Sequence, residues 1–214
     1  MTDADGNPDS FGLGTIVKTV KRGLGSRRRG KSEEVEEDIL TMVSEGQEKG
    51  TIEDDEAEMI SNIFALNDKE AGDIMTHRSQ IAGIEAEMTL KEALDYMLDG
   101  SNSRFPVYEE NIDHITGILF LKDAFRMNRI AANRKMAIKD IPDLLRKAVF
   151  VTEKKKIDIL FREMQQKKVQ MSIVIDEYGQ TAGLVTMEDI LEEIVGNIMD
   201  EYDPEENHIH KKGE

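Results

Sequence analysis

Thr186 and Asp189 stand where a short apolar run turns into an amphipathic segment, in the stretch GLVTMEDILEEIVG (residues 183–196). A threonine at the start of a helix accepts a backbone hydrogen bond, and an acidic residue in the first turn complements the helix dipole. The same backbone N–H groups also favour a bound phosphate, and a nearby carboxylate can accept hydrogen bonds from ribose hydroxyls. Taken alone, the fourteen residues favour the cap, and the ligand hypothesis needs further support.

A second polar group, NSRFPVY (residues 102–108), opens a predicted strand. Arg104 can direct two N–H donors at a phosphate, and Pro106 is tolerated at a strand start because no N–H is needed there. A solvated surface arginine is the alternative for Arg104. The tail contains His208 and His210, but two imidazoles need further ligands to hold a metal, so no metal site is predicted.

Catalytic motifs are missing from the sequence. It has no Ser-His-Asp order, no HExxH and no Walker loop. The lack of cysteine rules out thiol chemistry, disulfides and cysteine-bound zinc. We therefore expect a protein that is not an enzyme.

Charge divides the chain into two unlike parts. Residues 1–31 carry seven Lys and Arg against three Asp, and the remaining residues carry a net charge of −20. Such a body repels nucleic acid, so no nucleic-acid partner is expected. The segment TIVKTVKRGLGSRRRGK (residues 15–31) is either a solvated basic tail or a weak contact with an anionic membrane surface.

The sequence has no signal peptide and no run of eighteen apolar residues. We therefore expect a cytoplasmic protein, with peripheral contact at the inner face of the cell membrane if the basic arm binds lipid.

An internal repeat supplies the elements that must position these residues. At an offset of 67, FPVY (residues 105–108) falls on SIVI (residues 172–175). After a one-residue gap the offset is 66, so that Gly117 falls on Gly183 and Asp123 on Asp189. Each copy has the pattern β-α-β-β-α, and Thr89 with Glu92 forms a capping box in the first. Because neither copy holds a large core alone, the two should pack their strand faces together.

The predicted fold class is α+β, in five segments. These are a flexible basic arm (1–31), a helical lead-in (32–73), a first domain (74–137), a second domain (138–200) and an acidic, histidine-containing tail (201–214). Within the lead-in, Thr51 with Asp54 resembles a capping box for a second helix.

The paired unit, closed by Gly-apolar-apolar-Thr-x-x-Asp, resembles tandem CBS domains, or a Bateman module. DIMTHRSQIAGIEAEMTLKEALDYMLDGSNSRFPVYEENIDHITGILFLKD and VIDEYGQTAGLVTMEDILEEIVGNIMDEYD resemble the two halves of the CorC/HlyC proteins. These are magnesium and cobalt efflux proteins once labelled hemolysins, and relatives of the cyclin-M transporters. The resemblance covers about residues 33–203. Many members carry a transmembrane domain and a transporter-associated domain, so we expect this chain to be a regulatory module almost alone.

The resemblance implies a regulatory ligand, ATP or AMP, with Mg²⁺ on its phosphates. It also implies a site made of Thr76, Asn102, Ser103, Arg104, Phe105, Pro106, Thr186 and Asp189. In the first copy Phe120 stands where Thr186 stands, and its side chain cannot hydrogen-bond, so one nucleotide site is expected. The expected function is nucleotide sensing that regulates magnesium and cobalt efflux, with a membrane transport protein as a partner. The alternative is a dimerisation module whose nucleotide site has decayed.

The last predicted helix carries an apolar stripe of Ile190, Ile194 and Ile198, at i, i+4 and i+8. In the resembled family such faces pair two modules with two-fold symmetry. We therefore expect a homodimer through this stripe.

Overall fold

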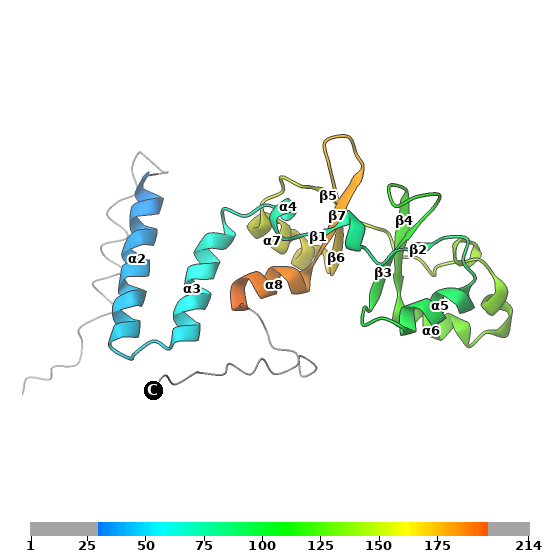
Figure 1. Ribbon diagram of the computed structural model, residues 1–214, viewed down its shortest axis with the longest axis horizontal. Helices are drawn as coiled ribbons and strands as arrows, with labels where there is room; N and C mark the ends of the chain where they lie inside the picture. Colours follow the sequence, from blue (N-terminus) through cyan, green and yellow to red (C-terminus); the bar gives the residue numbers. More distant parts are fainter. Residues whose placement is uncertain (1–29, 197–214) are drawn as a thin grey trace, which may run out of the picture.

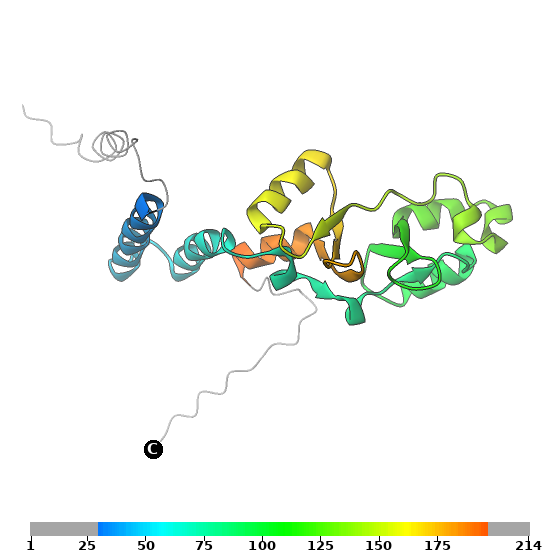
Figure 2. The same cartoon turned by 90° about the horizontal axis from the view of Figure 1, so that it is seen from above.

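The computed structural model describes residues 30–196, so the arm up to residue 29, Ile198 and the two tail histidines lie outside it. The described part is elongated (Figure 1), with two helices at one end, the second repeat in the middle and the first repeat at the far end. The view from above has the same order (Figure 2). The two end helices are α2 (Gly30–Glu48) and α3 (Asp54–Leu66).

Each repeat forms one sheet with two helices, which confirms the predicted α+β class. The first comprises β2 (Ile84–Glu85), α5 (Leu90–Leu98), β3 (Arg104–Tyr108), β4 (Ile115–Phe120) and α6 (Leu121–Asn128). The second comprises β5 (Phe150–Thr152), α7 (Ile157–Lys167), β6 (Met171–Ile175), β7 (Thr181–Thr186) and α8 (Met187–Val195). The remaining elements are α4 (Ala71–Ile74), β1 (Thr76–His77) and the 3₁₀ turns η1 (Arg78–Gln80), η2 (Ala131–Lys135) and η3 (Ile138–Asp140).

The strand registers confirm the repeat residue by residue. In the first sheet Val107 pairs with Gly117, and in the second Val174 pairs with Gly183. Both hairpins shift register at the next pair, Tyr108 with Ile115 and Ile175 with Thr181, so the one-residue gap between the sequence offsets falls in the turns, residues 109–114 and 176–180. The parallel strand β2 beside β3, and β5 beside β6, completes the correspondence.

Strand β1 joins the sheet of the second repeat although it precedes the first in sequence. It pairs antiparallel with β7, so the second sheet has the order β1-β7-β6-β5. Gly183 makes this approach possible, because a Cβ at that position would collide with the Thr76 carbonyl oxygen. The predicted boundary at residue 74 assigned Thr76 to the first domain, but its hydrogen-bonded neighbours belong to the second repeat.

The buried apolar residues form three groups, one inside each repeat and one between the two repeats. One lies inside the first repeat around Leu90, Phe105 and Leu119, and one inside the second around Ile157, Val185 and Ile190. The third joins the two sheets and contains Ile115, Ile118, Ala148, Met171, Ile173 and Leu184. The expectation that the copies bury their strand faces against each other is therefore confirmed.

The lead-in changes two expectations. Helix α3 begins at Asp54 with a capping box from Glu53 and Glu56, so the predicted box of Thr51 with Asp54 is wrong. The Thr51 hydroxyl instead donates to the Gly46 carbonyl oxygen at 2.9 Å, where α2 ends.

Two of the three residues of the predicted dimer stripe are covered by the lead-in, and the third, Ile198, lies outside the described residues. Ile190 is fully buried in a core shared with Leu66 of α3 and Ala71 of α4. Ile194 packs against the same core, and its carbonyl oxygen accepts a hydrogen bond from Asn62 Nδ2 at 3.3 Å. Both residues are therefore occupied within the chain.

Candidate functional site

Thr186 and Asp189 form the predicted capping box at the start of α8. Thr186 Oγ1 accepts from the Asp189 N–H at 3.2 Å, and Asp189 Oδ2 accepts from the Thr186 N–H at 2.8 Å. Burial raises the pKa of the Asp189 carboxyl, although the hydrogen bonds from Thr186 act the other way. The capping box is therefore present, but its hydrogen bonds do not fully offset the burial of the Asp189 carboxylate.

Thr76 shares a sheet face with Thr186. It pairs with Leu184, and Thr186 lies two residues beyond Leu184 on β7, so alternation puts the three side chains on one side of the sheet. Leu184 belongs to the apolar cluster between the repeats, so this face looks towards the first repeat. The second repeat thus presents two threonines and the Asp189 carboxylate at the junction.

Arg104 reaches this junction from the first repeat. Its Nη1 lies 3.5 Å from Glu188 Oε1, in the first turn of α8 and between the two residues of the capping box. The Arg104 side chain is 26 % exposed, and its Nε is buried without a hydrogen-bond partner. The structure therefore brings a guanidinium donor to the helix start that carries Thr186 and Asp189.

The other residues of the NSRFP segment differ in access. Ser103 and Arg104 line a hollow of about 470 Å³ with Leu98, Phe120, Leu121, Lys122 and Phe125. Asn102 is exposed in the loop before β3. Pro106 is buried opposite Ile118, whereas Phe105 fills the first core and stacks edge-on against Tyr96. Any ligand contact from Phe105 would therefore come from its backbone.

The first repeat has an equivalent place with different chemistry. Arg146 bridges to Ile118 as Thr76 pairs with Leu184, and Phe120 ends β4 as Thr186 ends β7. The Arg146 guanidinium donates to Asp123 Oδ2 at 2.8 and 3.1 Å. Its Cζ also lies 4.5 Å from the centroid of the Phe120 ring. The Asp123 carboxylate of the first copy is therefore already paired with the Arg146 guanidinium.

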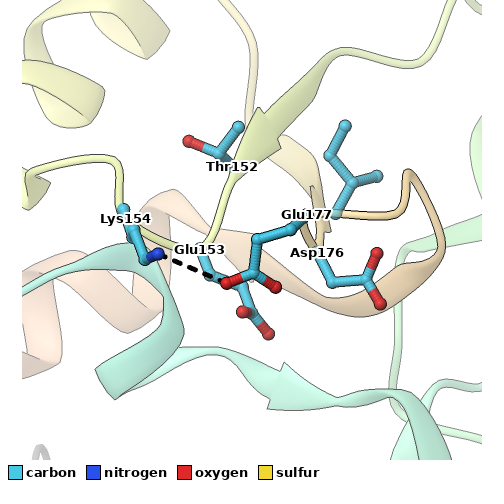
Figure 3. A pocket seen from close by; sticks show the side chains of 6 residues that line it. Thr152, Glu153, Lys154, Asp176 and Glu177 are labelled. Carbon is cyan, nitrogen blue, oxygen red and sulfur yellow. Dashed lines mark hydrogen bonds and ion pairs between the residues drawn. The ribbon is translucent and has the colours of Figure 1, made fainter.

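A smaller hollow of about 170 Å³ lies at the ends of β5 and β6 (Figure 3). Three carboxylates line it, and Lys154 pairs with one of them, Glu177, at 3.2 Å. None of the predicted site residues lines it, and its negative charge is unsuited to a phosphate.

Glu188 and Arg146 were missed by the sequence analysis. Glu188 lies inside the Thr-x-x-Asp motif, so its place in the motif was a usable signal. Arg146 lies in a connecting segment, and no motif in the sequence marks it.

The described residues contain neither a membrane-spanning helix nor a metal-binding cluster. Across residues 30–196 no helix is long and apolar enough to cross a membrane. Within the same range no three His, Asp or Glu side chains gather as a possible metal site.

The profile of the CBS domain family matches this chain twice, at residues 71–128 and 138–196. The UPF0053 protein YugS of Bacillus subtilis is 40% identical over 180 residues, 84% of this chain and 41% of the relative. The magnesium and cobalt efflux protein CorC of Escherichia coli K12 is 39% identical over 171 residues, 80% of this chain and 57% of the relative. The chain thus spans about half the length of the curated relatives it matches.

Solved structures agree with these matches. The CBS domain of a bacterial CNNM/CorC family Mg²⁺ transporter superposes with a TM-score of 0.70 at 36% identity, covering 77% of this chain and 98% of the other. Its complex with ATP gives 0.61 at 38% identity, covering 66% and 97%. A CBS-domain pair with bound AMP from Klebsiella pneumoniae gives 0.52 at 29% identity, covering 60% and 99%. With two CBS repeats joined through their sheets and these relatives, the chain belongs to the CBS-domain family as a tandem module of the CorC/CNNM group.

Proposed function

We propose that this chain is a non-catalytic sensing module that binds an adenosine nucleotide between its two repeats. The observation that carries the proposal is the approach of Arg104 to the start of α8, with its buried Nε–H lacking an acceptor. A phosphate suits a guanidinium beside a helix N-terminus, because both supply N–H donors to an anion. The solved relatives with ATP or AMP support this ligand class.

Each predicted residue has a distinct task in this proposal. Asp189 accepts hydrogen bonds from the ribose hydroxyls, which favour its ionised form and offset the burial that raises its pKa. Thr186 accepts one hydrogen bond from the backbone and keeps its hydroxyl proton for the ligand. Thr76 supplies a second hydroxyl on the same face, and Arg104 binds phosphate, with Asn102 and Ser103 at the margin.

Negative charge near the site sets the form of the ligand. Glu188 already competes for Arg104, and the chain beyond the arm carries −20. We therefore propose that ATP binds as its Mg²⁺ complex, since the ion reduces the charge of the polyphosphate. AMP has fewer charges to neutralise, so its binding should depend less on Mg²⁺.

Calorimetric titration of the full chain with Mg-ATP and AMP tests the proposal. Thr186→Ala removes a ligand contact and a helix cap together, and it should weaken binding about tenfold or more. Thr89→Ala is the matched control, because Thr89 and Glu92 form the same capping box on α5, away from the junction. It should lower thermal stability to a similar degree and leave affinity unchanged.

The alternative is a dimerisation module with a decayed nucleotide site. It predicts no heat and no thermal shift for wild-type protein with millimolar Mg-ATP or AMP. That result would eliminate the sensing proposal, and the measurement therefore separates the two functions directly.

A homodimer remains part of the proposal, but through a different helix face from the buried Ile190 stripe. Exposed apolar side chains on the helices of the repeats include Leu98 on α5, Phe125 on α6 and Leu191 on α8. They border two corresponding hollows, one between α5 and α6 and one between α7 and α8. Light scattering of wild type and Leu191→Glu at tens of micromolar tests this proposal. A monomer mass for the wild type, with and without nucleotide, would refute it.

We further propose that the module regulates magnesium or cobalt efflux through a membrane transport protein, as the name of its CorC relative suggests. It would act in the cytoplasm, with the basic arm in weak, salt-sensitive contact with the inner face of the membrane. The arm lies outside the described residues up to residue 29. Co-sedimentation with anionic vesicles, comparing the full chain with one lacking residues 1–29, decides the membrane contact. Equal sedimentation of both proteins would reduce the arm to a solvated tail.

A further inference from the structure

Two arginines share one aromatic ring at the junction of the repeats. Phe120 ends β4 directly opposite Arg104 in the β3–β4 register. The Arg104 Cζ lies over the Phe120 ring at 5.4 Å from its centroid, and the Arg146 Cζ lies over it at 4.5 Å. Both distances are within the range in which a cation is attracted to the face of an aromatic ring.

A charged network around Asp123 fixes Arg146 on this ring. Asp123, on the first turn of α6, binds Arg146 through two hydrogen bonds and lies 3.4 Å from Arg126. The Asp123 side chain is only 13 % exposed, so this arrangement is partly shielded from solvent. Arg146 is thereby fixed on the ring by a neighbouring carboxylate.

Arg104 has no comparable anchor. Its ion-pair partner in the described residues is Glu188, whose side chain is 62 % exposed, at a separation of 3.5 Å. The pair is therefore weak by geometry and by solvent screening. The guanidinium also lies over the Phe120 ring, while its Nη1 faces Glu188 at the start of α8.

We propose that Phe120 is a positioning residue for the nucleotide site of the second repeat, because its ring aims Arg104 at the phosphates. Phe120, which stands in the first copy where Thr186 stands in the second, thus serves the nucleotide site of the second copy. A long arginine side chain without such support loses more rotamer freedom when it binds a phosphate. This inference rests on the proposed nucleotide function.

The proposal predicts an effect that grows with the number of phosphates. In the full chain, Phe120→Leu should weaken Mg-ATP binding about threefold to tenfold by calorimetry. AMP should lose less affinity than Mg-ATP. Adenosine should bind the variant as tightly as it binds the wild type, because neither the ribose contacts nor the base contacts involve Arg104. Phe120→Tyr keeps an aromatic face and should retain wild-type affinity.

Two further variants separate positioning from folding. Phe64→Leu makes the same change at a half-buried ring of α3, which has no guanidinium over it in the described part of the chain, and it should leave affinity unchanged. Arg104→Ala should weaken Mg-ATP binding more than Phe120→Leu. The double variant should then be no worse than Arg104→Ala alone, since the ring acts only through that arginine.

Distinct outcomes overturn the inference and the function. Equal losses for adenosine and Mg-ATP in Phe120→Leu, or unchanged Mg-ATP binding in that variant, would overturn the positioning role. Absence of binding to the wild type would overturn the proposed function. The aiming of Arg104 is also measured without nucleotide, by the NMR signal of its Nε–H, which should be sharp in the wild type and broadened in Phe120→Leu. The same signal in both proteins would refute it.

Discussion

The two repeats have the same backbone plan and opposite side-chain chemistry at the same place. In the second, Thr76 lies beside the capping box of Thr186 and Asp189. In the first, the equivalent Arg146 is bound to Asp123. The fold therefore builds two similar positions at the junction, and the side chains leave only the second with a carboxylate free of an ion pair among the described residues.

The cores of the two repeats differ at a corresponding strand position. Phe105 of β3 fills the first core, whereas its counterpart on β6 is Ser172, which is fully buried with no partner for its hydroxyl. A buried hydroxyl without a partner costs free energy, so the second core carries a penalty that the first does not. Four experiments test contrasts of this kind between the repeats, from the largest expected effect to the smallest.

Phe105→Ala should destabilise the protein most. It empties a fully buried position in the first core, and such truncations cost about 3–5 kcal/mol of unfolding free energy. Urea denaturation measures the loss. A change below about 1 kcal/mol would mean that the first core collapses around the gap, contrary to close packing.

Asp189→Asn and Asp123→Asn apply one change to the two equivalent carboxylates. Asparagine keeps an oxygen that accepts the Thr186 N–H, so the cap of α8 should survive. Nucleotide affinity should fall about tenfold to a hundredfold for Asp189→Asn and change far less for Asp123→Asn, because asparagine keeps an oxygen that accepts from Arg146. Calorimetry decides, and equal losses for the two variants would abolish the functional distinction between the repeats.

The hairpin turns differ in what their aspartates bind. Asp113 accepts from Arg78 of the η1 turn and crosses to the second repeat, where it accepts from the Thr181 N–H at 3.0 Å. Asp176 instead accepts from Tyr178 and Gln180 of its own turn. The hydrogen bonds from Arg78 lower the Asp113 pKa, so its contribution to stability is present above the ordinary aspartate pKa and is lost as pH falls through the lowered value.

Asp113→Asn should therefore cost about 1–2 kcal/mol of unfolding free energy at pH 7. The difference from wild type should shrink as pH falls below about 4, where Asp113 becomes protonated in the unfolded chain, and should be smallest below the lowered pKa of the folded state. Asp176→Asn, which disturbs no contact between the repeats, is the control. A difference that stays constant with pH would show that the charge of Asp113 is unimportant. Denaturation across that pH range provides the measurement.

Ser172→Ala should have the smallest effect and the opposite sign. It removes the unpartnered hydroxyl and little volume, so stability should rise by about 1 kcal/mol. The rise would appear as a higher denaturation midpoint with an unchanged slope. A loss of stability would instead indicate that the hydroxyl has a partner, such as a buried water.

Much of the fold was predictable because its signals are local. Both capping boxes, at Thr89 and at Thr186, follow from residues three apart, and hydrophobic spacing with the one-residue gap gave the repeat. The Thr51 box failed because Glu53 and Glu56 offer a competing cap closer to the helix start. Ile190 lies on an apolar helix face, as predicted, but this face packs on the lead-in and not on a second copy of the chain. Periodicity indicates that a face is buried but does not show which element buries it.

The sequence by itself determined the two-copy β-α-β-β-α plan, the starts of α5 and α8, and the loss of a hydroxyl at Phe120. Tertiary structure alone decided that β1 carries Thr76 into the second sheet, that Arg104 meets Glu188, and that Arg146 occupies the first-copy carboxylate. The physical reason is the range of the interactions. Caps and strand alternation arise between residues a few positions apart, whereas these contacts join segments brought together only when the two sheets bury their shared apolar faces.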